Sequence, residues 1–337
     1  MKSSSRFLMA VAMLGIIAAP ALFAASPQTY TLKVAYAASD KTSGGATAAA
    51  VAKRLETESG GRIKVEIYPN AMLGGDRELL EGCQAGDISI VMQATAPQVS
   101  FIPQVAVFDM PVALIDVDVA TKILGSGLFR DTIAKYYEKA GLKLVLLAPS
   151  AFREMSSNKA VRAIEDFKGI KIRTMENKYH MAYWKNLGAN PTPLAFSELY
   201  ISLQQNLVQA QENPVEVLTA SKLGEVQKYV ILTHHILFIQ TFVMNKKLYD
   251  SMPADLQQLI LKVGYDAGVE SAKVAQVAAD ATLKTLTAQG KEIIQPTADM
   301  YAKMKAAARP VYDMISKDIG QDLVDAMLNA YEAASRK

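Results

Sequence analysis

The sequence predicts an α/β fold of two lobes, in which each lobe is a mixed, mostly parallel sheet flanked by helices and a long helix connects the two. The 337 residues exceed one comfortable hydrophobic core, so two domains are expected. Strand-like and helix-like segments alternate twice along the chain, an order that is typical of parallel sheets. One helix-compatible segment exceeds about 25 residues, a length typical of a helix that connects structural units.

The first half of the chain alternates between strand and helix patterns. In residues 63–67, isoleucine and valine alternate with Lys64 and Glu66, which is the period-two pattern of a strand with one buried face. Gly60-Gly61 separates this strand from the helix before it. The pattern as a whole predicts strands at residues 32–34, 63–67 and 88–92 and helices at residues 46–58 and 76–85.

The same pattern starts again beyond the middle of the chain. It predicts strands at residues 142–147, 170–173 and 236–243 and helices at residues 178–187 and 196–207, with Ser197 as a possible cap of the last helix. Residues 253–286 keep the helical spacing of apolar residues throughout. Because no flexible linker separates the two patterns, we expect interleaved lobes: residues 26–150 with 239–278 form lobe I, and residues 151–238 with 279–337 form lobe II.

Residues 1–25 have the layout of a secretory signal peptide. A positively charged start with Lys2 and Arg6 precedes an apolar run over residues 7–19, and small residues surround Ala25. The alternative is a single membrane anchor, which needs about 20 apolar residues. Pro20 and the change to polar residues at Ser26 favour the signal peptide. The mature protein is therefore expected to be exported and free in solution.

Composition excludes several classes of function. Without Lys2 and Arg6 the formal charge falls from +3 to +1, a balance that offers no attraction to nucleic acid or anionic membrane. Cys83 is the only cysteine, so the chain can form neither an internal disulfide nor a Cys-rich metal site, and Cys83 is expected to be a small residue on a helix. Three histidines make a His-rich metal site improbable. No cofactor or metal is expected.

Motifs for catalysis are also missing from the sequence. It contains no G-x-S-x-G elbow, no Walker loop and no H-E-x-x-H zinc motif. His234 and His235 precede a strand-like run and are expected to be strand-edge residues rather than ligands. Glu78 and Glu81 share a helix face that solvent would cover, with Asp76 pointing elsewhere. These residues give no indication of an enzyme.

A cationic and amide-bearing group of residues remains as the candidate site. Arg153 follows the expected strand 142–147, and Arg173 ends the expected strand 170–173. Gln211-Glu-Asn-Pro214 is expected to be a turn downstream that carries amide groups. Ligands of open α/β sheets bind at the carboxyl ends of parallel strands, and a guanidinium there can hold a carboxylate through two N–H donors. A surface ion pair is the alternative for each arginine, and for Arg153 the two interpretations are equally weighted.

Five motifs occur in order along the chain: Tyr68-Pro69, Leu73-Gly74, Gly169-Ile-Lys-Ile-Arg173, Gly188-Ala-Asn-Pro-Thr-Pro-Leu-Ala-Phe-Ser-Glu-Leu-Tyr200 and Gln211-Glu-Asn-Pro214. In these motifs the chain resembles the periplasmic solute-binding proteins of TRAP (tripartite ATP-independent periplasmic) transporters, such as those for dicarboxylates and sialic acid. The resemblance extends from Leu32 to about Ala333. The longest motif, which ends at Tyr200, is the strongest signal. The resemblance implies the two-lobed periplasmic binding protein fold.

The resemblance also implies roles for individual residues. Arg173 is expected to pair with the ligand carboxylate, Asn213 to hydrogen-bond it, Arg153 to make a second polar contact, and Phe196 to lie against the ligand. Gln93 and Tyr36 are further candidates for shaping the pocket. Two departures from the family pattern limit the transfer: Gln209-Ala210 replaces the usual Asp-Gly, and Ala37 and Ala94 stand where sialic-acid-binding relatives carry Asn and Glu. A smaller or less hydroxylated acid than sialic acid is therefore expected.

These expectations combine into one function. The protein is expected to be a monomer in the periplasm that closes its lobes around a small carboxylate and delivers it to the membrane permease subunits of a TRAP transporter, without catalysing a reaction. A solute-binding protein of the ABC-transporter type is the first alternative, since it shares two α/β lobes but not the long helix or the arginine-centred signature. A periplasmic enzyme on a two-lobed scaffold is the second alternative.

Overall fold

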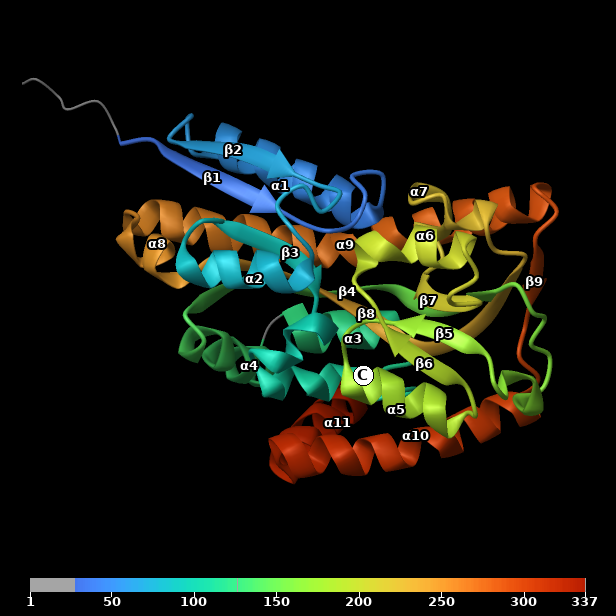
Figure 1. Ribbon diagram of the computed structural model, residues 1–337. Coiled ribbons are helices and arrows are strands. Elements are labelled where there is room, and N and C mark those ends of the chain that lie inside the picture. Colours follow the sequence, from blue (N-terminus) through green and yellow to red (C-terminus); the bar gives the residue numbers. More distant parts are fainter. Residues whose placement is uncertain (1–27, 126, 337) are drawn as a thin grey trace, which may run out of the picture.

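The computed structural model describes residues 28–125 and 127–336, so the expected signal peptide over residues 1–25 lies outside the described residues. Its nine strands form one sheet in the order β2-β1-β3-β8-β4-β7-β5-β6, and β9 pairs with β8 (Figure 1). The bounds of these strands are β1 Tyr30–Ala35, β2 Ile63–Tyr68, β3 Ile90–Ala94, β4 Leu142–Ser157, β5 Lys171–Thr174, β6 Asn190–Pro193, β7 Ala210–Pro214, β8 Tyr229–Asn245 and β9 Glu292–Ile294.

The sheet is mixed, and each of its halves contains a parallel group of strands. β1 pairs in parallel with β2 and β3, and β5 pairs in parallel with β6 and β7. Between these groups, β4 and β8 run antiparallel to each other, and they pair antiparallel with β7 and β3. β9 is parallel to β8. The predicted α/β fold with a mixed, mostly parallel sheet is confirmed.

Helices cover both faces of the sheet, and α9 (Ala254–Ala288) extends along both of its halves (Figure 1). The long helix predicted over residues 253–286 is therefore confirmed. Within the described part of the chain, no helix is both long enough and apolar enough to cross a membrane. The other helices are α1 Ser43–Glu58, α2 Asp76–Ala85, α3 Val117–Gly125, α4 Leu128–Lys139, α5 Lys178–Asn186, α6 Leu199–Gln204, α7 Val217–Ala220, α8 Lys246–Ser251, α10 Ala298–Ile319 and α11 Gln321–Ser335, with the 3₁₀ helices η1 Ala96–Ser100, η2 Pro103–Asp109, η3 Ile164–Phe167, η4 Phe196–Glu198 and η5 Leu223–Glu225.

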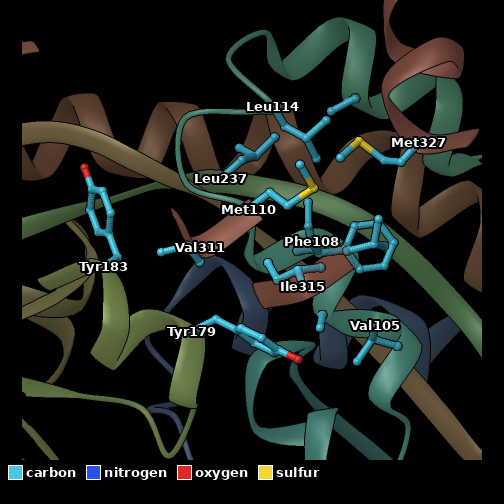
Figure 2. Close-up of a cluster of buried hydrophobic side chains, with 14 of the residues drawn as sticks. Val105, Phe108, Met110, Leu114, Tyr179, Tyr183, Leu237, Val311, Ile315 and Met327 are labelled. Carbon is cyan, nitrogen blue, oxygen red and sulfur yellow. The ribbon is translucent and has the colours of Figure 1, made fainter. Parts of the chain in front are cut away.

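The hydrophobic core is continuous on one face of the sheet and divided on the other. On the first face, residues 105–114 pack against α5, α10, α11 and β8 in a cluster that joins both halves of the sheet (Figure 2). On the opposite face, one cluster lies under α1 and the start of α9, and a second lies under α6, α7 and the end of α9. The two halves are therefore fixed together on one face and separated on the other, which leaves room for a cleft.

β4 and β8 are much longer than the sequence predicted. The strands expected at residues 142–147 and 236–243 extend to Leu142–Ser157 and Tyr229–Asn245, so both strands run through both halves of the sheet. Their pairing shifts register between Pro149 and Phe152 and again between Arg153 and Met155, and His234 adopts a left-handed φ of 45°. Such irregularities break the period-two pattern from which strands are recognised, and this explains why the sequence pattern hid half of each strand.

Other differences from the predicted elements are small except near Phe196. The helices expected at residues 46–58, 76–85 and 178–187 correspond to α1, α2 and α5, and the strand expected at residues 88–92 lies two residues later as β3. Residues 196–207 form η4 and the short α6 rather than one helix, and no side chain caps either of them, so the prediction of a Ser197 cap was wrong. Asn206, two residues after the end of α6, has a left-handed φ of 57°.

Candidate functional site

A pocket lies between the two halves of the sheet. Residues 37–44, Asp76 and the end of β3 line it from one side, and β5, Phe196 and residues 213–217 line it from the other, while β4 and β8 pass beneath. The cavity volume of about 90 Å³ suits a small molecule. Five of the six predicted ligand-binding residues line this pocket: Arg153, Arg173, Asn213, Phe196 and Gln93. Tyr36 lies instead in the core under α1, where it is 1% exposed.

Arg153 lies inside β4 rather than in a loop after a strand, which corrects the prediction. Its side chain is 1% exposed. Nε donates a hydrogen bond to Oε2 of Glu212 at 2.5 Å, and Nη2 donates to Oε1 of the same carboxylate at 3.0 Å. The two residues therefore form a two-point ion pair inside the protein. Nη1 has no hydrogen-bond partner in the protein, so one corner of this guanidinium remains for the pocket.

Arg173 is just as buried, at 2% exposed, but no carboxylate within residues 28–125 and 127–336 forms a hydrogen bond or ion pair with it. Nε and Nη2 both donate to the backbone carbonyl of Leu194, at 2.9 and 2.7 Å, while Nη1 has no hydrogen-bond partner. The ring of Phe196 lies 5.9 Å from the guanidinium carbon. Burial lowers the pKa of Arg173 to about 10, so the side chain is still charged at neutral pH. Arg173 is a buried cation that lacks an anionic partner in direct contact.

Asn213 lies in β7, so the segment predicted as a turn over residues 211–214 is a strand. Its Oδ1 accepts a hydrogen bond from Arg153 at 3.2 Å, and its Nδ2 donates to Oε1 of Gln211 at 2.6 Å. Gln211 in turn donates to the hydroxyl of Ser156. This chain of bonds fixes the amide beside Arg153, with one N–H of Nδ2 left over for a ligand.

Two glutamines on neighbouring strands bring further polar groups to the pocket. Gln93, the last residue but one of β3, is 5% exposed, and Gln240 in β8 is 3% exposed. Neither Nε2 nor Oε1 of Gln93 has a partner, and Nε2 of Gln240 has none. Buried amides are normally satisfied, so unpartnered atoms in a pocket wall indicate where a ligand would bond. The sequence analysis selected Gln93 but not Gln240.

Asp76 is a pocket residue that the sequence pattern did not indicate. It is the first residue of α2 and lines the pocket. Burial raises the pKa of Asp76 to about 6, although the charges of Arg173 and Arg153 oppose this shift. The helix pattern alone placed Asp76 away from Glu78, but it could not indicate that α2 begins at a pocket. The Leu73-Gly74 motif just before it was the signal that could have located this residue.

Behind Arg153, a row of alternating charges extends away from the pocket. Glu212 forms the ion pair with Arg153. The ring of His180 lies between two carboxylates, with Nδ1 3.9 Å from Oε1 of Glu212 and Nε2 3.1 Å from Oδ1 of Asp109. Although burial disfavours the charged ring, Asp109 and Glu212 raise the pKa of His180 to about 9. Burial likewise opposes ionisation of Glu212, but Arg153 and the two neighbouring histidines hold its pKa well below its usual range. The charges of Arg153, Glu212, His180 and Asp109 thus balance one another.

The two adjacent histidines of β8 differ from their predicted role at a strand edge. His235 is fully buried, and its Nε2 donates to Glu212 at 3.0 Å while Nδ1 accepts from the hydroxyl of Thr233 at 2.8 Å. Burial lowers the pKa of His235, so the neutral ring is the form that fits these bonds. His234 is half-buried, and its backbone N–H donates to Glu154 at 2.8 Å. His235 therefore helps to position Glu212, and its place in the core explains why it is not an edge residue.

A carboxylate connects the two sides of the pocket. Glu216, two residues after the end of β7, accepts hydrogen bonds from the hydroxyl and from the backbone N–H of Ser43, at 2.6 and 3.0 Å. Ser43 is the first residue of α1, and a helix N-terminus favours a negative charge. Both residues line the pocket. No sequence pattern indicates this contact, because 173 residues separate the two partners.

The pocket wall presents hydrogen-bond donors that suit an anion. Its free donors are Nη1 of both arginines and the amides of Gln93 and Gln240. His180 and His235, the two buried histidines, bond to other protein groups and do not line the pocket. Among residues 28–125 and 127–336, no three His, Cys, Asp or Glu side chains are grouped so that they could hold a metal ion.

Comparisons with known proteins agree with this arrangement. The sequence model of the family described as bacterial extracellular solute-binding protein, family 7 (DctP), matches residues 34–318. A solute-binding protein of Verminephrobacter eiseniae is 34% identical over 284 residues, which cover 83% of each chain. The sialic acid-binding periplasmic protein SiaP of Vibrio cholerae is 31% identical over 321 residues, which cover 94% of this chain and 97% of SiaP.

A solved structure gives the same result for the fold. The crystal structure of the sugar acid binding protein DctPAm of Advenella mimigardefordensis, in complex with galactonate, superposes with a TM-score of 0.88 at 27% identity. The match covers 92% of this chain and 100% of that chain. The predicted two-lobed fold with its long helix is confirmed by this similarity.

Proposed function

Because this chain belongs to family 7 of the bacterial extracellular solute-binding proteins, the solute-capturing components of TRAP transporters, we propose that Arg173 anchors its ligand, a small organic acid. In such a system the protein captures the acid outside the cytoplasm and delivers it to the membrane permease. The single observation that carries the proposed anchor is the unpaired edge of Arg173, which is buried in the pocket wall. The family membership also removes the ABC-transporter type as an alternative.

The energetic argument concerns the cost of burying a charge. A buried charge without an ionic partner is unfavourable by several kcal/mol, and hydrogen-bonded ion pairing offsets this cost. Arg153 already has Glu212 as its partner, whereas Arg173 has a backbone carbonyl alone. A ligand carboxylate placed at Nη1 of Arg173 would supply the missing negative charge. The empty position beside Arg173 is therefore the most favourable place for an anion in this pocket.

The other lining residues complete the proposed site. Asn213 and Nη1 of Arg153 bond the same carboxylate or the atom next to it, and Phe196 covers the ligand from the side of η4. Gln93 bonds a polar group further along the ligand. Tyr36 supports the wall from the core under α1 without touching the ligand. Phe238, with its ring 5.6 Å from the guanidinium carbon of Arg153, forms part of the apolar wall.

Ligand capture is proposed to close the lobes around the pocket. The predicted division, with residues 26–150 and 239–278 in lobe I and residues 151–238 and 279–337 in lobe II, places Ser43 and Glu216 in different lobes. Their hydrogen bonds would then form on closure. The irregular segments of β4 and β8 lie where both strands pass between the lobes, a position suited to a hinge. We further propose that the protein acts as a periplasmic monomer and catalyses no reaction.

A thermal-shift screen against organic and sugar acids tests this function. A ligand at about 100 times its dissociation constant stabilises the protein by ~2.7 kcal/mol, which is readily measured. The strongest acid should also reduce the radius of gyration in small-angle scattering. If no acid raises the melting temperature, the proposed function is wrong. If the protein converts an acid into a product during incubation, it is an enzyme and the proposed function is wrong.

A further inference from the structure

The pocket wall is asymmetric in charge. Among the described residues that line it, Arg153 and Arg173 are the cations, and Asp76 and Glu216 are the anions. The charge of Arg153 is already compensated, because both oxygens of Glu212 bond to it. Arg173 forms no ion pair with a carboxylate of the described residues, so it is the one cation of the wall with which a ligand carboxylate can pair directly. A second ligand carboxylate finds no unpaired cation among these lining residues.

Glu216 bonds to Ser43 and not to either arginine. It is 6% exposed, and its two carboxylate oxygens accept hydrogen bonds from the hydroxyl and the backbone N–H of Ser43. Burial raises the pKa of Glu216, and these two bonds oppose the rise. The carboxylate is thus held in the pocket wall without an ion pair to Arg153 or Arg173.

The free polar groups of the remaining wall are uncharged. Gln93 and Gln240 present amide atoms that have no partner in the protein, and both side chains are more than nine-tenths buried. An amide can donate to and accept from a hydroxyl, a carbonyl or another amide. Two amides cannot neutralise a second carboxylate, and moving a carboxylate into a buried place without a cation costs several kcal/mol.

From these three observations we propose that the site selects monocarboxylates whose remaining polar groups are uncharged, and that Glu216 is a specificity-determining residue that excludes a second carboxylate. The inference rests on the proposed function, because it assumes that Arg173 holds the first carboxylate. It names the class of ligand: a small acid with a single negative charge and hydroxyl, carbonyl or amide groups along its chain.

Calorimetry with pairs of acids that differ in one charge tests the selection. Three pairs are succinamate with succinate, glutaramate with glutarate, and gluconate with glucarate. The fourth pair is the tightest-binding acid of the thermal-shift screen and a counterpart that differs from it by one carboxylate at the second end, which is added to a monoanion or replaced by a carboxamide in a dianion. At pH 8 every carboxylate of these ligands is ionised. In each pair that binds, the dianion should bind at least about tenfold more weakly, equivalent to ~1.4 kcal/mol.

Exchange of Glu216 by its uncharged isostere identifies the residue responsible. Glu216→Gln should strengthen binding of the dianion relative to the monoanion by at least about threefold. Glu270→Gln, an exposed residue of α9, changes the total charge equally and should leave the ratio unchanged. Circular dichroism checks that both variants are folded.

The possible outcomes separate the two proposals. Equal or tighter binding of a dianion by the unaltered protein overturns the charge selection while leaving the proposed function intact. An unchanged ratio in Glu216→Gln, with both ligands weakened equally, shows that Glu216 acts through its bond to Ser43 and overturns its role in specificity. Failure of every acid to bind contradicts the proposed function itself.

Discussion

Arg153 and Arg173 face the same pocket and are equally buried, yet their surroundings differ. Arg153 is held at two points by Glu212, which belongs to a row of charges that continues to His180 and Asp109. Arg173 bonds to the backbone carbonyl of Leu194, and no carboxylate of the described residues forms an ion pair with it. Burial alone therefore does not distinguish the two arginines. The lack of a carboxylate partner distinguishes Arg173, and it is the reason why Arg173 is the proposed anchor.

The difference assigns different tasks to the two arginines. The ion pair of Arg153 contributes to the folded structure and leaves one donor for the ligand, so Arg153 can distinguish ligands by what lies next to the carboxylate. Under the proposed function a ligand carboxylate compensates the charge of Arg173, so Arg173 should contribute to the affinity for every acid. Substitutions around each arginine should therefore affect different measured quantities: stability around Arg153, and binding around Arg173.

The largest expected effect is on stability, from Glu212→Gln. Removing one partner of a buried ion pair costs ~3–5 kcal/mol, because Arg153 and His180 are left without their shared anion. Denaturant unfolding of the unliganded protein measures this loss. Glu176→Gln, close to Arg173 but outside the ion pair, is a suitable comparison and should lose much less. Equal stability of Glu212→Gln and the unaltered protein would mean that the row of charges does not stabilise the fold.

Arg173→Lys should have the next largest effect, and it should affect binding. An ammonium cannot reproduce the planar fork of the guanidinium, and truncating one partner of a buried charge pair costs ~2–5 kcal/mol, a loss of roughly thirtyfold or more in affinity. Calorimetry with the strongest acid of the screen measures it. Since lysine keeps the charge, the unliganded variant should unfold at nearly the same denaturant concentration as the unaltered protein. Near-native affinity of Arg173→Lys would mean that Arg153, and not Arg173, is the main contact of the ligand carboxylate.

The charge row should also make stability depend on pH. The pKa of His180 is raised to about 9, above the value of about 6.5 in an unfolded chain, so its contribution is complete below pH 6.5 and is lost as the pH rises through 9. The free energy of unfolding should fall by up to ~1.4 kcal/mol for each pH unit within this window. In His180→Gln this slope should be reduced. An identical slope in both proteins would show that other groups control alkaline stability.

Ser43→Ala should have the smallest effect, and it should concern closure. The substitution removes the hydroxyl bond to Glu216 but keeps the backbone bond, so about 0.5–1.5 kcal/mol of closed-state stability should be lost. All ligands should bind more weakly by a similar factor, because the contact lies between the two proposed lobes and involves no ligand atom. Thr132→Ala, on the surface of α4, serves as the matched control. A change confined to one class of acid would indicate that Ser43 contacts the ligand.

The sequence could predict the elements that follow a regular period. Apolar residues recur at the spacing of a strand or a helix in three predicted elements. These are the strand over residues 63–67, the long helix α9 and the strand that ends near Arg173. The complete β4 could not be predicted, since its bulges interrupt the alternation where Arg153 lies. The pattern therefore placed Arg153 in a loop, although its structural position is inside a strand.

The candidate site was predictable in part, for a different reason. Arg173, Asn213 and Phe196 occur in motifs whose family resemblance implies a ligand site, and the fold brings them to one pocket. Asp76, Gln240 and Glu216 belong to the same pocket, but each meets it through contacts between segments that are distant in the chain. Charged residues at helix ends or strand positions are common, so their position along the sequence does not distinguish a surface residue from a pocket residue.

A crystal structure of the complex with the strongest acid of the thermal-shift screen tests the central claim most directly. If Arg173 is the uncompensated anchor, a ligand carboxylate oxygen will lie within about 3 Å of its Nη1, at the donor that has no partner in the protein. The bonds between Arg153 and Glu212 will remain in place. A carboxylate that bonds Arg153 after displacing Glu212, with Nη1 of Arg173 still unpaired, would contradict the account.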